Sequence, residues 1–284
     1  MSNKLKLFVC LFVVFINTLS KAEIITTYSV NSSTVQKIEE WIDKDTIILV
    51  ELDDTLMMPK SKMFSFDSNP YRMFLNNLIT LGERSPAYTK AVANWYGQRK
   101  VRLVEEGWPD FISRARAKGA KIYGICSMPL YLLNIEERRL KELKDLGIIF
   151  DSKLNNSEEF EIKKEFPWFA RFHKGIVYNG PYSKHEAILE LFKIANLSPK
   201  KFLTFANVKY EIKLVDKALR KFNMYFKSVL YLGSREVTGR PNEEIVKFQQ
   251  RQLIETGKWH EDDEASKLLD FRQQQKNSGS AESQ

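Results

Sequence analysis

The residues best suited to chemistry follow the first strongly apolar run of the chain that has strand length. Residues 46–50 (Thr-Ile-Ile-Leu-Val) predict a buried strand, and Glu51, Asp53 and Thr55 come directly after it. Carboxylates gathered at one strand end repel each other unless a cation neutralises them. Ligands that are all oxygen atoms favour a hard ion such as Mg²⁺, so this acidic strand end predicts a magnesium site.

Four further residues carry polar groups at matching places of the predicted sheet. Cys126 and Ser127 end a second strand, Asn207 follows a third, and Lys184 opens a helix. In an open parallel sheet, ligands bind beyond the carboxyl ends of the strands, so we expect these side chains to converge. A carboxylate nucleophile, a lysine and a divalent cation together suit phosphoryl transfer.

The alternation of strands and helices predicts the scaffold that positions these groups. From residue 108 on, short apolar runs alternate with amphipathic helices, which predicts an α/β fold with a Rossmann-like parallel sheet. Residues 57–107 lack a strong strand and predict a helical insertion, with helices at 70–82 and 86–105. The expected strands of the core lie at 46–50, 121–126, 148–150, 175–178, 202–205 and 226–232.

The chain also divides into regions outside this core. Lys4 and Lys6 precede an apolar run at 7–16, and small residues flank a cut after Ala22, which predicts a signal peptide. An uncleaved anchor and a buried core helix are the alternatives, although the run is about half of the roughly 20 residues that a membrane span needs. The predicted regions are a signal peptide at 1–22, a helical lead-in at 23–45, core at 46–56 and 108–235, a cap at 57–107, C-terminal helices at 236–271 and a disordered tail at 272–284.

Composition and charge exclude some classes of protein. The chain is 43% hydrophobic, which is enough for a packed core and excludes global disorder. Its formal charge is +8, but three of the lysines lie in the first 22 residues and the others are interspersed with acids. No basic motif indicates nucleic-acid binding. We therefore expect a periplasmic or secreted protein that meets the membrane only through its N-terminal segment.

The motifs resemble those of the haloacid-dehalogenase-like superfamily. Residues 48–56 are similar to its first motif, a hydrophobic strand followed by Asp-x-Asp-x-Thr, and 124–127 are similar to its second. Lys184 matches the lysine of the third motif, and 205–211 resemble the fourth. The chain looks closest to an uncharacterised family of signal-bearing bacterial proteins within that superfamily. The resemblance implies that 57–107 form a helical type 1 cap.

The resemblance implies a role for each matched residue of the first motif. Glu51 stands at the nucleophile, Asp53 at the general acid/base, and Thr55 at the threonine that shapes the loop. Glutamate is one methylene longer than the usual aspartate, which moves its carboxylate about 1.5 Å further out. A misplacement of about 1 Å can lower a rate about 10²-fold.

The other motifs depart from the pattern as well. Cys126 stands where a hydroxyl normally binds a phosphate oxygen, and Ser127 beside it is the available substitute. Lys184 would steady the charge of the nucleophile and the phosphate. The implied Mg²⁺ ligands are Glu51, Asp53, Asn207 and Glu211. Because Asn207 replaces a carboxylate, the affinity of this set for the ion is lowered.

Two functions stay open on this basis. The first is an exported protein of phosphatase ancestry that has lost catalysis and binds a ligand or a protein, with a phosphorylated small molecule as one candidate. The second is an active, Mg²⁺-dependent phosphohydrolase with an altered nucleophile position. Release of phosphate from an aryl phosphate, its dependence on Mg²⁺ and its loss on Asp53→Asn separate the two.

Overall fold

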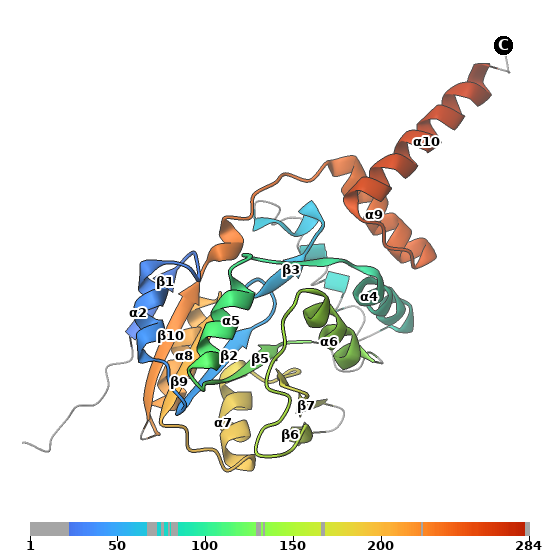
Figure 1. The fold of residues 1–284 in the computed structure, drawn as a ribbon. Coiled ribbons are helices and arrows are strands. Elements are labelled where there is room, and N and C mark those ends of the chain that lie inside the picture. The colour runs from blue at the N-terminus through green and yellow to red at the C-terminus, as the bar shows by residue number, and fades with distance from the viewer. Residues whose placement is uncertain are drawn as a thin grey trace, which may run out of the picture.

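A computed structural model of the chain shows an α/β fold with a Rossmann-like core (Figure 1). It describes residues 23–281 apart from 67–72, 75–76, 79, 81–84, 129–131, 133, 166–167 and 223. The predicted signal peptide at 1–22 therefore lies outside the described residues, as does most of the predicted helix at 70–82.

One eight-stranded sheet, in the order β1-β10-β9-β2-β5-β8-β7-β6, forms the centre of the molecule. The strands from β1 to β8 in that order are parallel, and β7 and β6 extend the sheet in antiparallel fashion. Their bounds are β1 Glu23–Thr27, β2 Thr46–Glu51, β5 Lys121–Cys126, β6 Glu159–Glu165, β7 Trp168–His173, β8 Ile176–Tyr178, β9 Lys201–Ala206 and β10 Tyr225–Tyr231.

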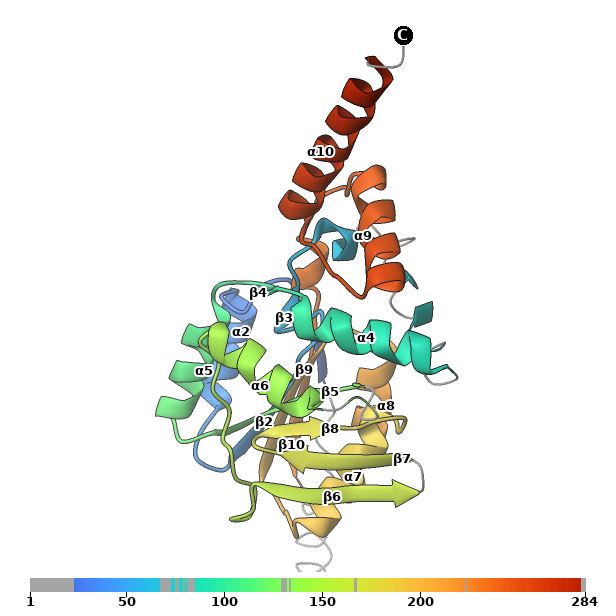
Figure 2. The same ribbon diagram turned by 90° about the vertical axis from the view of Figure 1, so that its right-hand side faces the viewer.

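Helices cover both faces of this sheet (Figure 2). Alternate residues of β2 divide between the two layers: Ile48 and Val50 join the core under α2, α5 and α6, whereas Leu49 joins the core under α7 and α8. This alternation is the period of two that a strand buried on both faces requires. The helices are α2 Ser33–Trp41, α5 Trp108–Ala117, α6 Ile135–Asp145, α7 Lys184–Ile194 and α8 Lys209–Leu219.

The chain order places a switch point at β2. From β2 the chain passes to β5 and β8 on one side, and α7 then carries it back to β9 on the other side. The carboxyl ends of β5, β2 and β9 therefore face one crevice, where connections leave in opposite directions.

Several predicted boundaries need correction. Residues 148–150 are not a strand; instead the segment is tied to the sheet at Asp151, which accepts from and donates to the backbone of Ile122. The predicted lead-in begins with the edge strand β1, and the irregular stretch at 151–182 contains β6 and β7. The two edge strands β1 and β6 are stabilised by pairing with β10 and β7.

The insertion at 57–107 is not purely helical. A two-stranded hairpin, β3 Met57–Pro59 with β4 Val101–Leu103, brackets α4 Pro86–Gln98. The predicted helix at 86–105 therefore ends early, and the next residues pair with β3. The predicted disordered tail is helical up to Ala281, where α10 Asp262–Ala281 ends, and its first part up to Lys276 consists of good helix formers.

The C-terminal helices pack on the insertion rather than forming a separate region. Asp262 accepts from Ser61 Oγ at 2.6 Å and from the Lys62 backbone N–H at 2.9 Å. The indole of Trp259 packs in one cluster with Trp95 and Phe64. The insertion, α9 Glu243–Thr256 and the start of α10 thus form one layer above the carboxyl ends of the strands (Figure 2). None of the helices described is long and apolar enough to cross a membrane.

We expect Asp262→Ala to lower the free energy of unfolding by about 2 kcal/mol, because it removes charge-assisted hydrogen bonds that join distant segments. The matched control is Asp263→Ala, which removes an exposed acid from the same first turn of α10. Chemical denaturation measures both. Equal effects of the two changes would mean that the contacts with Ser61 and Lys62 contribute nothing beyond helix electrostatics.

Candidate functional site

The acidic segment after β2 forms a tight loop over the switch point. The backbone N–H groups of Leu56 and Met57 both donate to the carbonyl of Leu52, at 3.1 and 2.9 Å. Asp54 takes a left-handed conformation with φ of 58°, which turns the chain back after Asp53. This geometry leaves Glu51 buried at the strand end and presents Asp53 at the rim.

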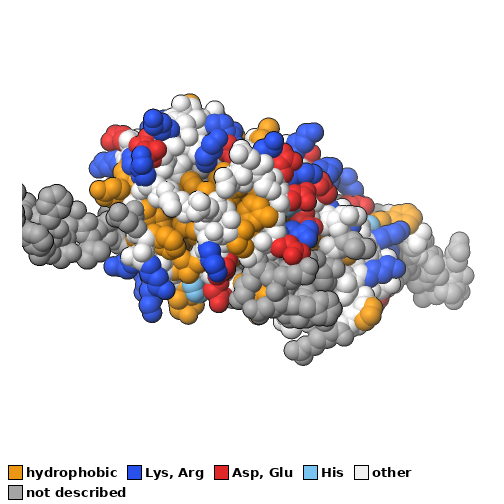
Figure 3. Space-filling model, turned by 90° about the horizontal axis from the view of Figure 1, so that it is seen from below, with side chains coloured by type: hydrophobic (Ala, Val, Ile, Leu, Met, Phe, Trp, Pro, Cys, Tyr) orange, Lys and Arg blue, Asp and Glu red, His pale blue; other side chains and the backbone are white. Residues whose placement is uncertain are grey.

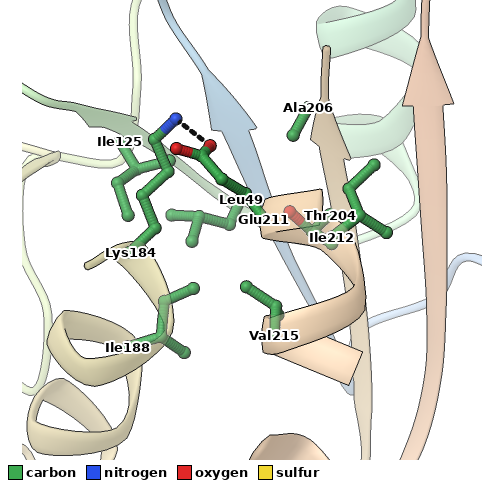
Figure 4. Close-up of a pocket in the computed structure, with 9 residues that line it drawn as sticks. All are labelled: Leu49, Ile125, Lys184, Ile188, Thr204, Ala206, Glu211, Ile212 and Val215. Atoms are coloured by element: carbon green, nitrogen blue, oxygen red, sulfur yellow. Dashed lines mark hydrogen bonds and ion pairs between the residues drawn. The ribbon is translucent and has the colours of Figure 1, made fainter. Parts of the chain in front are cut away.

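Lys184 joins two of the predicted site residues. It is the first residue of α7, whose start is fixed by a capping box between Ser183 and Glu186. Its ammonium forms a buried hydrogen bond with the carboxylate of Glu51, and lies 2.5 Å from the carboxylate of Glu211 at the start of α8. Figure 4 shows Lys184 and Glu211 reaching toward each other above a pocket whose other lining is mainly apolar.

Burial governs the protonation of this cluster. It raises the pKa of Glu51 from the ordinary 4.5 to about 7, although Lys184 and the backbone N–H of Asn207 oppose the rise. Burial by itself would lower the pKa of Lys184, but Glu51 and Glu211 outweigh it and raise that pKa. Lys184 therefore stays charged, and Glu51 titrates near neutrality.

Asp53 is paired with an arginine that the sequence did not single out. Arg139 of α6 donates through one terminal nitrogen to both carboxylate oxygens of Asp53, at 2.7 and 2.6 Å. The Arg139 side chain is fully buried, whereas Asp53 keeps 42% of its side chain exposed. Burial raises the pKa of Asp53, but Arg139 and then Arg99 outweigh it, so this pKa lies below its usual value.

This pair belongs to a chain of charges that reaches the insertion. Arg139 also donates to Glu142 at 2.9 Å, and Glu142 accepts two hydrogen bonds from Arg99 at 2.7 and 2.9 Å. Arg99 follows α4 and stacks on Trp95 and Tyr96, with its guanidinium carbon 4.4 and 4.6 Å from the ring centroids. The insertion is therefore tied to Asp53 through alternating charges.

Cys126 and Ser127 take different places at the end of β5. Cys126 is 1% exposed, and burial raises the pKa of its thiol to about 12, so it remains a neutral buried thiol. Ser127 is exposed and donates from Oγ to Asn179 Oδ1 at 3.0 Å. Of the two, Ser127 offers its hydroxyl to the crevice. Asn179 follows β8, so the rule that placed Asn207 after a strand end would also have found it.

The side chains of Asn207 and Thr55 make fewer polar contacts than their motif positions imply. The backbone N–H of Asn207 donates to Glu51 at 3.2 Å. Its side-chain Oδ1 and the Thr55 hydroxyl are buried and have no hydrogen-bond partner among the residues described. The buried Asn207 oxygen can only accept, so it calls for an additional donor or cation.

The predicted Mg²⁺ ligands do not form a free ligand set in this arrangement. Glu51 and Glu211 share the Lys184 ammonium, and both oxygens of Asp53 accept from Arg139. Within the described part of the chain, no group of three or more His, Cys, Asp and Glu side chains has a geometry that would hold a metal ion. Lysine and arginine already neutralise these carboxylates, so the residues present do not fit a Mg²⁺ site as they stand. The magnesium site stays a prediction.

These features define an α/β protein with a Rossmann-like core and a polar, internally paired cluster at its switch point. Residues 29–266 match the model of the family described as Protein of unknown function (DUF2608), and the chain belongs to this family. It is also similar to the uncharacterized protein RP296 of Rickettsia prowazekii (strain Madrid E), with 34% identity over 251 residues, 87% of this chain and 92% of that protein. No solved structure matches the chain.

We expect Arg139→Met to lower the free energy of unfolding by about 3 kcal/mol, because it leaves Asp53 without its buried counter-charge and Glu142 with Arg99 alone. Arg138→Met on the same helix is the control and removes only a hydrogen bond to the Ala93 carbonyl, so its cost is about 1 kcal/mol. Adding Asp53→Asn to Arg139→Met is expected to restore part of the loss in urea denaturation. No recovery in the double variant would mean that lost packing of Arg139, rather than the unpaired charge, causes the effect.

The raised pKa of Glu51 predicts a specific pH dependence of stability. The folded state holds this proton more tightly than the unfolded chain, so the contribution is complete below pH 4.5 and is lost as the pH rises through about 7. Relative to Glu51→Gln, the wild type is expected to lose about 3 kcal/mol of unfolding free energy across that window. Denaturation at a series of pH values measures the difference between the two chains. Parallel curves would show that Glu51 titrates at its ordinary pKa.

Proposed function

We propose that this chain is an exported haloacid-dehalogenase-like protein of phosphatase ancestry that binds a ligand or a protein and has lost catalysis. The four motif segments lie in the order of that superfamily, and their residues meet at the switch point of the sheet. This agreement supports the ancestry. The pairing of the charged groups supports the loss of catalysis.

The observation that carries the proposal is the ion pair between Asp53 and Arg139. At the acid/base position, a carboxyl group has to hold a proton in order to give it to the leaving group. Arg139 donates to both oxygens of Asp53 and contributes to the lowered pKa of that carboxyl. Asp53 therefore stays ionised at neutral pH and cannot serve as the proton donor.

Glu51 adds a second obstacle. Its side chain is 9% exposed, one carboxylate oxygen is held by Lys184, and the other accepts from the Asn207 backbone at 3.2 Å. A nucleophile has to approach phosphorus in line with the leaving group. A buried carboxylate with both oxygens engaged would have to leave these partners before it could attack.

The alternative is a Mg²⁺-dependent phosphohydrolase with an altered nucleophile. The contact of Lys184 with Glu51 and the exposed hydroxyl of Ser127 favour it, because such groups would bind a phosphoryl substrate. In that case Lys184 and Arg139 would have to release these carboxylates before Glu51, Asp53, Asn207 and Glu211 could hold Mg²⁺.

Hydrolysis of p-nitrophenyl phosphate tests the proposal. We expect the full chain with Mg²⁺ to release phosphate no faster than Asp53→Asn, and we expect Glu51→Asp to bring no turnover, because Arg139 still engages Asp53. Mg²⁺ is expected to leave the melting temperature unchanged, since an ion that binds the folded state would raise it.

The matched control for Asp53→Asn is Asp54→Asn, one residue further along the same loop. Phosphate release that needs Mg²⁺, disappears in Asp53→Asn and persists in Asp54→Asn would establish the phosphohydrolase instead. A gain of turnover in Glu51→Asp alone would mean that only the length of the nucleophile had silenced the site.

A further inference from the structure

The end of the sheet opposite the candidate site carries exposed hydrophobic side chains. Ile194 ends α7, Phe222 follows α8 and Tyr225 begins β10, and they are 46%, 36% and 60% exposed. Phe222 packs edge-on against Phe192 with ring centroids 5.7 Å apart, which brings the ends of α7 and α8 together. The three side chains thus gather around the amino-terminal ends of β9 and β10.

Lysines border this apolar area. Lys193 and Lys200 keep 76% and 75% of their side chains exposed, and Lys221 is exposed as well. Lys193 lies 3.4 Å from Glu190 and Lys200 lies 3.0 Å from Asp45, and exposed pairs of this kind are weak and are easily exchanged for other anions. Figure 3 views the molecule from this end and shows hydrophobic side chains with both basic and acidic side chains around them. We call the six residues named above the basal surface: Lys193, Ile194, Lys200, Lys221, Phe222 and Tyr225.

The N-terminal segment joins the fold at the same end. Glu23, the first residue of β1, lies in register with Lys227, two positions after Tyr225. Until the predicted cut after Ala22, the chain before Glu23 therefore continues from the side of the basal surface. Six residues separate the apolar run at 7–16 from β1, so the connection spans at most about 25 Å.

We propose that the basal surface rests on an anionic membrane, with the candidate site facing away from the lipid. Aromatic and aliphatic side chains that enter the interface, next to lysines that meet acidic headgroups, have the chemistry that such a surface binds. A second copy of the chain fits this surface poorly. Two-fold pairing would place the same patch against itself and set its lysines against each other. This proposal is independent of whether the site is catalytic, and it replaces the expectation that only the N-terminal segment meets the membrane.

Fluorescence quenching in vesicles tests this orientation with the full chain. Ser198→Cys places a labelled thiol in the exposed loop between α7 and β9, and Gln273→Cys places one on the exposed part of α10. Both are made with Cys10→Ser, and the buried Cys126 is left in place. The vesicles contain phosphatidylcholine and phosphatidylglycerol, with a headgroup spin label as quencher. We expect at least about twofold stronger quenching at position 198 than at position 273.

Charge reversal then tests the lysines. A triple variant is expected to reduce quenching at position 198 to the level at position 273; it combines Lys193→Glu, Lys200→Glu and Lys221→Glu. Omission of phosphatidylglycerol is expected to have the same effect. The control variant combines Lys141→Glu, Lys247→Glu and Lys267→Glu and changes the net charge by the same amount. It is expected to leave the quenching at position 198 unchanged. Equal quenching at 198 and 273 in the unreversed chain would overturn the proposal. So would quenching at 198 that survives the basal reversal, or concentration-dependent self-quenching that indicates pairing of two copies.

Discussion

A guanidinium with no access to solvent has to be neutralised by its neighbours, and Arg139 imposes this requirement on three parts of the chain. It binds Asp53 on the loop after β2, Glu142 one turn further along α6, and the sulfur of Met128 after β5. Through Glu142 it also fixes Arg99 at the end of α4. Burying this one charge therefore determines the position of α6, the shape of the acidic loop and the place where the insertion packs.

Together with Lys184, this arrangement gives the site a definite electrostatic character. Within the described part of the chain, the two buried cations Lys184 and Arg139 are already engaged by carboxylates, and Asp53 and Glu211 keep part of their side chains exposed. A phosphate group would have to compete with these carboxylates for Lys184. A partner that brings hydrogen-bond donors meets no such competition and finds an unpaired acceptor in Asn207.

The sequence predicts the core of the fold well because its strands have strong local patterns. β2 and β5 have the expected positions, and Glu51, Lys184 and Glu211 meet as strand-end geometry requires. The edge strands β1 and β6 are missed because their stability comes from pairing rather than from an apolar run. Arg139 is missed for a related reason. It lies in a helix of alternating charges, where nothing in the local pattern distinguishes the one guanidinium that points inward from those that point to solvent.

The contact between Asp262 and Ser61 has a consequence for biosynthesis. The two residues are separated by 201 positions, so the layer above the switch point is complete only when nearly the whole chain has emerged from the ribosome or crossed a membrane. Until then the C-terminal helices do not cover the hairpin of β3 and β4, the rings of Trp95 and Phe64, or the rim of the crevice. A chain that stops short of Trp259 would keep its central sheet but expose this aromatic surface, which makes truncated products targets for chaperones and proteases.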